Sequence, residues 1–543
     1  MRFSKVSPVA MVFAILAFCV VARANDVYIA QTASGSANGS SCANAYAYTY
    51  FNASGNWTSA TPSGMQIGPG STVHLCGTFT APAGASGYLS FQGSGNAASP
   101  VALLFESGAV LTSTYWGSNG AIFAGGLSFI TVNGGPNGGG LIQATANGTG
   151  MANQRNGAGI FFTNVSNSVI ENVTISNIYV HGSVSDENGQ ETYGILWNFG
   201  SNVTINNNTV HDALVDIRYA YLASSTSSNI NIFDNTVYDT NWGIIIGDGG
   251  ENATLNGPVA VYGNVIHDFS MWDDSANYNH HDGVYCFATN TNSVMNACDI
   301  YDNYIYGDPG THTNTFIFAS ASATGSSINN LHVFNNLLTN TATALANTPA
   351  NGLIQIWVSN GQVYNNTLIG NGQNQENGLG NTSVAISNNP GKGLILQNNI
   401  ISNFYLGLYT GSGATYAVSD GNDFSNLIYT GTDNTNTYYQ TLADYQTCTK
   451  NGCPAIHDTH SISAAPNLNS SYQPQSSSPT NMAGFNLTSV GITNLDLDRA
   501  DNPRPPGTCS TQGTPSCWGM GAYQFVSSAA PPTPGTALTA QAY

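Results

Sequence analysis

Charged side chains are scarce in this sequence, and positively charged ones are the scarcest. Only 7% of the residues are charged, and 9 Lys and Arg face 28 Asp and Glu, for a formal net charge of −19. So few cations exclude nucleic acid as a partner, because binding to phosphates depends on Lys and Arg. They also disfavour a highly anionic polysaccharide, unless bound Ca²⁺ supplies the positive charge. Solubility must therefore rest on Asn, Ser and Thr.

Long apolar runs are absent after the first 24 residues. Within residues 1–24, Arg2 and Lys5 precede an apolar stretch at 9–21, which is short for a membrane span and is followed by small residues at 22–24. This pattern predicts a secretory signal peptide, and an uncleaved anchor is the alternative. We therefore expect a secreted or cell-surface protein with no transmembrane segment after signal cleavage.

The sequence has no two cysteines in CysxxCys spacing, which disfavours a zinc site. Cys19 lies in the predicted signal, so eight of the nine cysteines remain. An even number in an exported protein favours disulfides, although the spacing leaves their connectivity open. Proximity in sequence suggests four local pairs: Cys42 with Cys76, Cys286 with Cys298, Cys448 with Cys453, and Cys509 with Cys517.

A short phrase recurs through the middle of the chain. Each copy has two β-branched or aromatic runs around an Asn corner, as in 232–239 and 300–307. The copies follow one another at intervals of 27, 29, 39, 33, 30 and 33 residues, counted between Asn208, Asn235, Asn264, Asn303, Asn336, Asn366 and Asn399. Such a period predicts a solenoid, and the short runs predict β-strands. Stacked Asn corners would hydrogen-bond to one another, which explains the Asn without invoking function.

A second series of strands, mostly led by Gly, lies between the Asn phrases. In parallel rungs its members would stack into an inward column of Ile160, Ile195, Ile217, Ile244, Val284, Phe316 and Leu353. We therefore predict an all-β parallel solenoid with terminal caps. The expected divisions are a signal peptide (1–24), an N-terminal cap with the first rungs (25–110), the solenoid (111–430), C-terminal loops and a cap (431–527), and a Pro/Ala-rich tail (528–543).

Over roughly residues 70–430 this pattern resembles the right-handed parallel β-helix proteins of the pectate-lyase-like superfold; the handedness is implied by the resemblance. Segments 495–505 and 519–525 resemble the closing segment of exported bacterial β-helix repeat proteins. Proteins of this kind act on polysaccharides or cell-surface glycans, or serve as non-catalytic adhesins and carbohydrate-binding scaffolds. We expect such a partner, and a monomer.

The longest local insertion, 269–284, holds the most distinctive polar residues. It contains His280, His281 and Asp282 before a Gly-led strand, and a second polar insertion at 186–192 enters the same strand column earlier. The step Asp282–Gly283 is similar to one in β-helix hydrolases of the polygalacturonase type. The paired AspAsp, the GlyHisGly and the ArgIleLys of that family are absent from this sequence.

The rung register gives these residues possible roles. Asp282 aligns with Trp242, and Asp216 lies two rungs away, or roughly 9–10 Å. Inverting glycosidases separate their carboxyl groups by about 6.5–9.5 Å. We therefore favour hydrolysis, with Asp282 and Asp216 as acid and base and with His280 or His281 as an orienting group. Aromatic side chains are the candidates for sugar binding: Trp242, Tyr285, Trp272 and Tyr193.

A lyase is the second enzymatic interpretation. It needs a base and a cation that stabilises the developing negative charge. Arg218 is the basic residue of the strand column, although it could equally be a structural partner of Asp216. No cofactor is certain, but carboxylates could collect Ca²⁺: Asp216, Asp248, Asp273 and Asp274. Further acids recur at the corners, at Asp212, Asp239, Asp268 and Asp308, and such a column is typical of turn chemistry.

Overall fold

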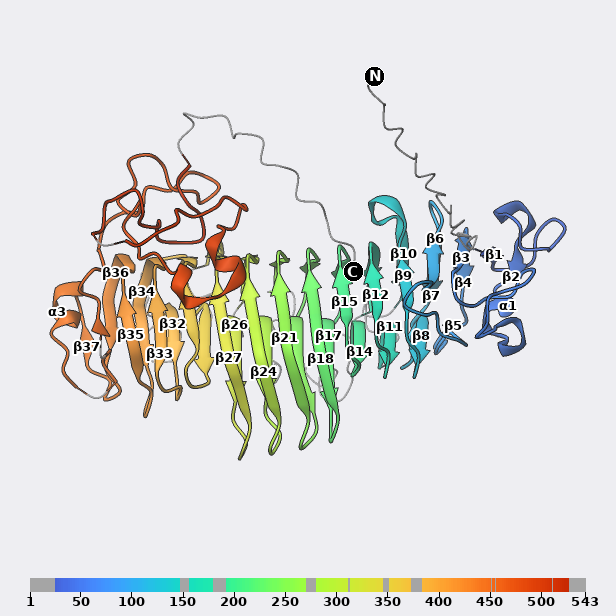
Figure 1. The fold of residues 1–543 in the computed structure, drawn as a ribbon, viewed down its shortest axis with the longest axis horizontal. Helices are drawn as coiled ribbons and strands as arrows, with labels where there is room; N and C mark the ends of the chain where they lie inside the picture. Colours follow the sequence, from blue (N-terminus) through green and yellow to red (C-terminus); the bar gives the residue numbers. More distant parts are fainter. Residues whose placement is uncertain are drawn as a thin grey trace, which may run out of the picture.

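The computed structural model describes residues 25–146, 156–178, 192–269, 280–310, 313–344, 351–372, 383–450, 452–454, 456–509 and 511–526. Strands of similar direction stack into one elongated body (Figure 1). Every named strand pair in the described chain is parallel, except β36 (Asp423–Thr432) with β37 (Tyr438–Tyr439). Among the described residues no helix is both long and apolar enough to span a membrane.

One face of the body is a 15-stranded parallel sheet, here called sheet A. Its strands contribute alternate residues to the core, as the burial pattern of β6 shows. In order, they are β2 (Tyr46–Ala47), β1 (Asn25–Ala30), β3 (Ser71–Cys76), β6 (Val101–Phe105), β9 (Ile130–Asn133), β12 (Ser168–Glu171), β15 (Val203–Asn206), β18 (Thr226–Phe233), β21 (Thr254–Tyr262), β24 (Val294–Tyr301), β27 (Ser327–Phe334), β30 (Gln362–Tyr364), β33 (Leu394–Gln397), β35 (Tyr416–Asp420) and β38 (Ile456–His457). Residues 25–110, expected to hold an N-terminal cap with the first rungs, supply β1, β2, β3 and β6 to this sheet.

Two further columns of parallel strands complete each rung. The corner column contains β4 (Thr78–Thr80), β7 (Val110–Ser113), β10 (Gly140–Ala144), β13 (Val173–Ser176), β16 (Thr209–His211), β19 (Thr236–Tyr238), β22 (Val265–His267), β25 (Tyr304–Gly307), β28 (Leu337–Asn340) and β31 (Thr367–Ile369). The groove column contains β11 (Gly157–Thr163), β14 (Thr192–Asn198), β17 (Val215–Leu222), β20 (Trp242–Gly249), β23 (His281–Ala288), β26 (Thr313–Ala321), β29 (Ile354–Trp357) and β32 (Val384–Asn388). Both columns pair with β34 (Ile400–Thr410), which pairs with β36.

The remaining elements are short and lie toward the two ends. Near the N-terminal end, β5 (Leu89–Ser90) pairs with β8 (Ile122–Gly125), and α1 (Thr49–Asn52) packs nearby. At the other end, α3 (Leu442–Gln446) follows β37 and lies at the end of the stack (Figure 1). Its Tyr445 is buried in the core cluster.

The core is filled by aligned aliphatic side chains. Ile195, Ile217, Ile244 and Val284 stand in register and are fully buried. The predicted continuation through Phe316 and Leu353 is wrong by one residue, because Val284 pairs with Ile317, which pairs with Ile354. The cause is a register shift between β23 and β26 beside His281 and Asp282.

The Asn corners form one buried ladder. Each side chain donates from Nδ2 to the Oδ1 of the next at 2.9–3.0 Å, from Asn208 through Asn399 to Asn422. The residue before each ladder Asn has a left-handed backbone, as at Asp234 (φ 54°) and Asn335 (φ 55°). Asn and Asp tolerate this conformation better than most residues, which explains the double polar corner.

Three of the four expected cysteine pairs are disulfides: Cys42–Cys76, Cys448–Cys453 and Cys509–Cys517. The fourth expectation requires correction. Cys286 on β23 and Cys298 on β24 face each other in the core as free thiols, with their sulfurs 2.9 Å apart. This separation exceeds a disulfide bond of about 2.05 Å, so the two thiols contact each other without a covalent bridge.

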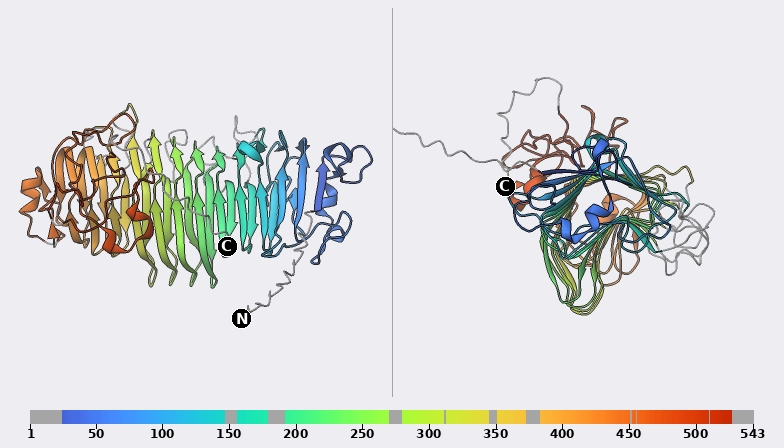
Figure 2. Two further views of the ribbon diagram at one scale, coloured as in Figure 1. Left: turned by 45° about the horizontal axis from the view of Figure 1, so that its top comes forward. Right: turned by 90° about the vertical axis from the view of Figure 1, so that its right-hand side faces the viewer.

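The C-terminal segment, here residues 485–523, packs along the side of the solenoid. Leu487, Leu495 and Trp518 cover the aromatic side chains of sheet A, and Arg504 donates to Asn335 Oδ1 at 2.8 Å. Figures 1 and 2 show this segment beside the last rungs, while α3 lies at the end of the stack. The aromatic stack of Tyr262, Tyr301 and Phe334, with ring centroids 4.8 Å apart, provides the apolar surface on which it packs.

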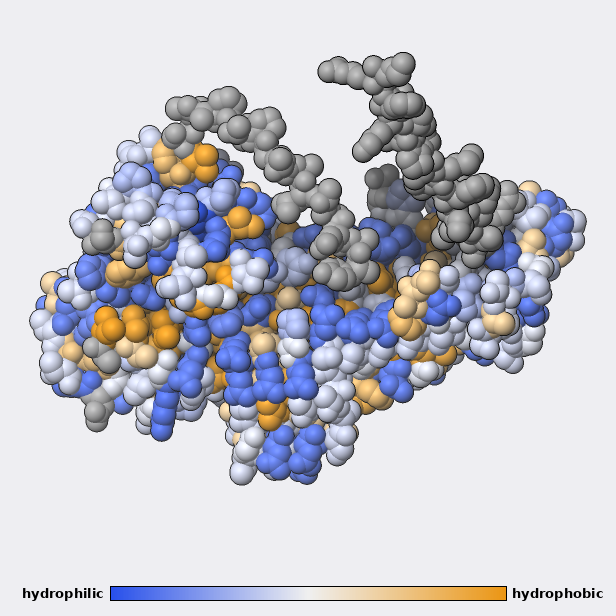
Figure 3. Space-filling model, viewed as in Figure 1, coloured by the Kyte–Doolittle hydropathy of each residue, from blue (hydrophilic) through white to orange (hydrophobic). Residues whose placement is uncertain are grey.

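Four consecutive rungs have longer strands than the rungs on either side of them. The pairs β17–β18, β20–β21, β23–β24 and β26–β27 extend beyond their neighbours and form a ridge, seen below the body in Figure 1 and as a lobe in the end-on view of Figure 2. Rows of hydrophilic residues cross the long strands in Figure 3. An exposed Asn256–Asn296–Asn329 ladder lies on sheet A.

The buried Asn ladder should contribute strongly to stability. Asn264 accepts from the backbone and side chain of Asn235, and donates to Ile232 O and Asn303 Oδ1, each at 3.0 Å. Asn264→Ala should lower the free energy of unfolding by about 3–5 kcal/mol, because several buried polar groups lose their partners. Asn296→Ala, in the exposed ladder, should cost about 0.5 kcal/mol or less. Urea denaturation followed by circular dichroism measures both, and equal losses would contradict a special role of the buried ladder.

Candidate active site

A cavity of about 280 Å³ opens on the outer face of three consecutive groove strands, β17, β20 and β23. Its lining combines a guanidinium and an imidazole with several aromatic rings: Arg218, Trp242, Ile245, His280, Tyr285, Phe287 and Thr289. Because stacked rungs lie about 4.7–4.9 Å apart, the cavity spans about 10 Å along the solenoid.

Strand register places the walls of this cavity. Arg218, Ile245, Tyr285 and Phe318 occupy equivalent positions on successive rungs and alternate with the inward column. Two residues further along, Phe287 pairs with Gly247, where an added Cβ would lie 2.0 Å from the Phe287 ring. Gly247 therefore makes room for this ring, and a larger residue there would displace it.

His280 and Asp282 form an ion pair at the rim of the groove strands. His280 Nδ1 lies 2.6 Å from Asp282 Oδ2, and the Asp282 side chain is 0% exposed whereas that of His280 is 40% exposed. Burial raises the pKa of Asp282 to about 6, against the opposing charge of His280. Burial lowers the pKa of His280, but the charge and contact of Asp282 outweigh it and leave that pKa above its usual value.

The imidazole is held in place from several sides. The Trp242 indole N–H donates to the backbone carbonyl of His280. The imidazole ring of His280 contacts the rings of Tyr285 and Phe318 edge-on, at centroid distances of 6.0 and 6.3 Å. Because Nδ1 faces Asp282, Nε2 is the nitrogen left to accept a proton. A buried carboxylate that orients a partly exposed imidazole is an arrangement suited to general base catalysis.

Arg218 brings positive charge to the same cavity. Its Nη1 donates to Tyr193 Oη at 3.0 Å, and its guanidinium lies 5.7 Å from the Tyr193 ring centroid. Tyr285 stacks on Phe318 at 4.5 Å and has its hydroxyl 2.9 Å from Ser320 Oγ. Four of the residues named from the sequence thus line the cavity: Arg218, Trp242, His280 and Tyr285. Tyr193 contacts one of them, and Asp282 lies behind His280.

Asp216 lies elsewhere. It is fully buried at the position of Gly243 and Gly283, where an added Cβ would meet the core side chains of Ile266 and Ile305 at 3.0 Å. Burial raises the pKa of Asp216, and the negative charge of Asp212 at the neighbouring corner raises it further. The groups that act on its carboxyl are therefore those of the corner, and the structure does not bring Asp216 together with Asp282.

The other residues predicted to belong to the site do not line the cavity. His281 is buried and its Nδ1 contacts Asn241 Oδ1, away from His280. Asp248 accepts from the backbone N–H groups of Thr289 (3.0 Å) and Asn290 (2.6 Å), so it caps a turn. Trp272, Asp273 and Asp274 lie outside the described residues.

Outside the cavity, three side chains of types that can bind a metal ion lie close together in the described part of the chain. Cys448, Cys453 and His457 bring ligand atoms within 4.8 Å of one another, but the two cysteines form a disulfide and offer no thiolate. The expected collection of Ca²⁺ by Asp216 and Asp248 finds no support in their positions, since one carboxylate points to the interior and the other caps a turn.

Sequence reasoning missed Phe287, Phe318 and Thr289. The signal was present in the strand period, because Phe287 follows Tyr285 by two residues and therefore shares its face. Phe318 follows from the same register one rung later. Thr289 lies beyond the end of β23, where the pattern ends.

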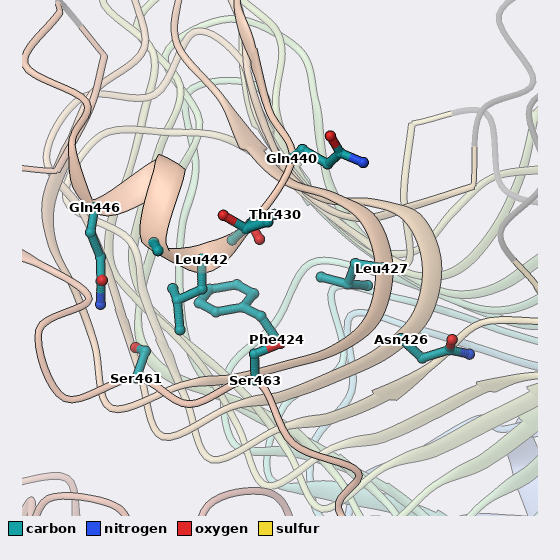
Figure 4. A pocket seen from close by; sticks show the side chains of 11 residues that line it. Phe424, Asn426, Leu427, Thr430, Gln440, Leu442, Gln446, Ser461 and Ser463 are labelled. Atoms are coloured by element: carbon teal, nitrogen blue, oxygen red, sulfur yellow. The ribbon is translucent and has the colours of Figure 1, made fainter.

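A larger cavity, of about 580 Å³, lies at the C-terminal end. Figure 4 shows Leu442 of α3 beside the ring of Phe424, with amides and hydroxyls around them. None of its lining side chains is ionisable. It therefore offers no acid, base or charge for catalysis, and the groove cavity is the better candidate site.

Comparisons with known proteins show similarity of overall form at low sequence identity. No family model and no curated protein matches. Pectate lyase Pel9A aligns with 93% of this chain and 98% of its own at 14% identity and a TM-score of 0.41. The mannuronan C-5 epimerase AlgE4 A-module of Azotobacter vinelandii aligns with 60% of this chain and 85% of its own, at 13% identity and a TM-score of 0.34. DFA-IIIase from Arthrobacter chlorophenolicus A6 aligns with 74% of this chain and 91% of its own, at 14% identity and a TM-score of 0.35.

The fold is assigned by the strand pairing of the chain itself. Three parallel columns repeat in register along the solenoid, and crossovers between parallel strands of one sheet are right-handed in almost all proteins. The chain is a right-handed parallel β-helix.

Proposed function

We propose that this protein is an extracellular enzyme that cleaves a polysaccharide by β-elimination at a uronic acid residue bound in the groove cavity. One observation carries the proposal: the oriented base His280 and the cation Arg218 line the same cavity. The three disulfides support an oxidising, extracellular location.

The aromatic walls suit a sugar substrate. Trp242, Tyr285 and Phe287 are each partly exposed, and their apolar faces would pack against sugar rings. Arg218, as a forked donor, would bind the uronate carboxylate. The cavity crosses three rungs and so follows the solenoid axis, the direction in which an extended polymer would lie.

The elimination follows from these two groups. His280 Nε2 removes the proton from C5, next to the carboxylate, and Arg218 stabilises the negative charge that develops there. The electrons form the C4–C5 double bond, the C4–O4 bond breaks, and O4 takes a proton from water. Asp282 stabilises the imidazolium that forms and keeps Nε2 directed at the substrate.

Hydrolysis, favoured from the sequence, is the second candidate. The raised pKa of Asp282, about 6, suits a general acid. Two observations weigh against it: Asp282 is fully buried behind His280, and Asp216, its expected partner, points to the interior.

The first prediction of the proposed function concerns His280. His280→Gln should lower kcat about 10²–10⁴-fold on a uronate-containing polysaccharide, because the general base is lost. The matched control is His332→Gln, since His332 forms a similar pair with Asp299 (2.7 Å) on sheet A, and its activity should be unchanged. Ultraviolet-absorbing products would identify elimination. New reducing ends without such absorption would support the hydrolase, and no release from a broad panel would support a carbohydrate-binding scaffold.

The second prediction concerns pH. Asp282 keeps the pKa of His280 above 6.5, and the base is active only when neutral. As the pH increases, kcat/KM of the wild type should therefore rise, with its midpoint above pH 6.5. In Asp282→Asn the raising charge is gone while burial still lowers the pKa. The rising limb should therefore move to lower pH, with a reduced maximum. An unchanged midpoint in the pH profile of kcat/KM would refute the coupling.

A further inference from the structure

The larger cavity, here called the end cavity, lies beside the last rung of the solenoid. One edge of β36 pairs with β34. Along the other edge, Asp423 bridges to Ile462, and the last two residues of β36 pair with β37. Between these two contacts, no strand of the described chain pairs with residues 425–430 on that edge. Three residues that line the end cavity belong to this stretch, so backbone groups of an open strand edge are available for hydrogen bonds there.

A second wall of the end cavity is fixed by the fold. The helix α3 is held to the core by Tyr445, which is 0% exposed. Its first turn is closed by a capping box, in which Asp444 N–H donates to Thr441 Oγ1 at 3.0 Å and Thr441 N–H donates to Asp444 Oδ2 at 3.2 Å. Leu442 and Ala443 of this helix line the cavity. The cavity is thus preformed, and its volume lies within the roughly 300–1,000 Å³ of small-molecule sites.

The lining of the end cavity is polar without being charged. Two carboxylates adjoin it, and both accept hydrogen bonds within the protein. Asp444 accepts from Thr441 Oγ1 at 2.7 Å, and the fully buried Asp458 accepts from Ser461 Oγ at 2.6 Å. A charged ligand would lose its hydration without finding a counter-ion among the lining side chains, so the ligand should be uncharged. The polar lining residues are Asn426, Thr430, Gln440, Thr441, Gln446, Ser461 and Ser463.

Several of these polar groups can reach a ligand. Gln440 and Ser463 are exposed at the mouth of the cavity. Gln446 donates from Nε2 to the backbone carbonyl of Asp458 at 2.6 Å, which leaves its Oε1 as an acceptor. The lining therefore offers donors and acceptors side by side, and a ligand must supply both.

Apolar side chains lie among these polar groups. Figure 4 shows Leu442 and the ring of Phe424 on one side of the opening and Leu427 on the other, with Thr430 between them. Leu427 and Leu442 are partly exposed, whereas Phe424 is only 1% exposed. The two leucines thus offer a small apolar contact next to the donors and acceptors.

We propose that the end cavity is a second carbohydrate site, which binds a short stretch of neutral sugar residues. Sugar hydroxyls both donate and accept, as this lining requires, and the C–H faces of a sugar ring suit the two leucines. A peptide strand added to the open edge fits less well, because Asn426 has a left-handed backbone (φ 51°) that interrupts the extended conformation. The inference does not rest on the proposed function, since five strand pairings, or about 24 Å, separate β36 from β23.

The test measures the binding of neutral tetrasaccharides to the full chain. The probes are xylotetraose, cellotetraose and mannotetraose, with tetragalacturonate as the charged comparison, each titrated calorimetrically. At least one neutral probe should bind more tightly than tetragalacturonate. Ala443→Trp, which places an indole in the end cavity from an exposed helix position, should abolish this binding. Trp242→Ala, in the groove cavity, should leave it unchanged.

A milder change tests the hydrogen bonds. Gln440→Ala combined with Ser463→Ala should weaken the binding about tenfold, because two groups that contact the sugar are lost. The matched control combines Gln475→Ala with Ser476→Ala, an exposed Gln and an exposed Ser outside the cavity, and its affinity should equal that of the wild type. Circular dichroism checks that each variant is folded.

The remaining outcomes decide against the inference or against the proposed function. Absence of binding by all three neutral probes would overturn the inference. Binding that survives Ala443→Trp or is lost in Trp242→Ala would also overturn it, because the groove cavity would then be the site. Binding that is lost only in the variants of the end cavity, in a protein that releases no unsaturated products, would refute β-elimination and leave the second site standing.

Discussion

The register of the stacked rungs is the constraint on which the rest of this structure depends. The buried Asn ladder enforces it, because each Asn side chain finds its partners only when the rung above is aligned. A slip of one residue would also exchange the core and solvent faces of a strand. With the register held, Arg218 lies beside Ile245 and Tyr285, and Trp242 lies between Val215 and Asp282. A purely structural device thus assembles a cavity from residues far apart in the sequence.

Two buried aspartates show how burial assigns different roles to the same side chain. Asp216 and Asp282 are both fully buried, and burial raises the pKa of each. Asp282 has the imidazole of His280 beside it, so its charge can be balanced and can act on a partly exposed base. Asp216 has Asp212 as its charged neighbour, which favours the neutral form and suits a structural position at the corner.

The fold alone does not identify the chemistry, since one architecture hosts many activities. The proposal therefore depends on the His280–Asp282 pair, on Arg218 and on the rings around them.

The sequence by itself determined the all-β repeat, the Asn ladder and the alignment of Asp282 with Trp242, because period and turn chemistry are local properties. It also suggested four local cysteine pairs, three of which are disulfides. Only the tertiary structure decided that Asp216 faces the interior, that Asp248 caps a turn and that Cys286 and Cys298 remain thiols. It also decided that the C-terminal segment lies along the side of sheet A. The physical reason is that side-chain direction, and the choice of packing surface, depend on neighbouring rungs. A shift such as that beside His281 changes the direction of a side chain without leaving a mark in the repeat.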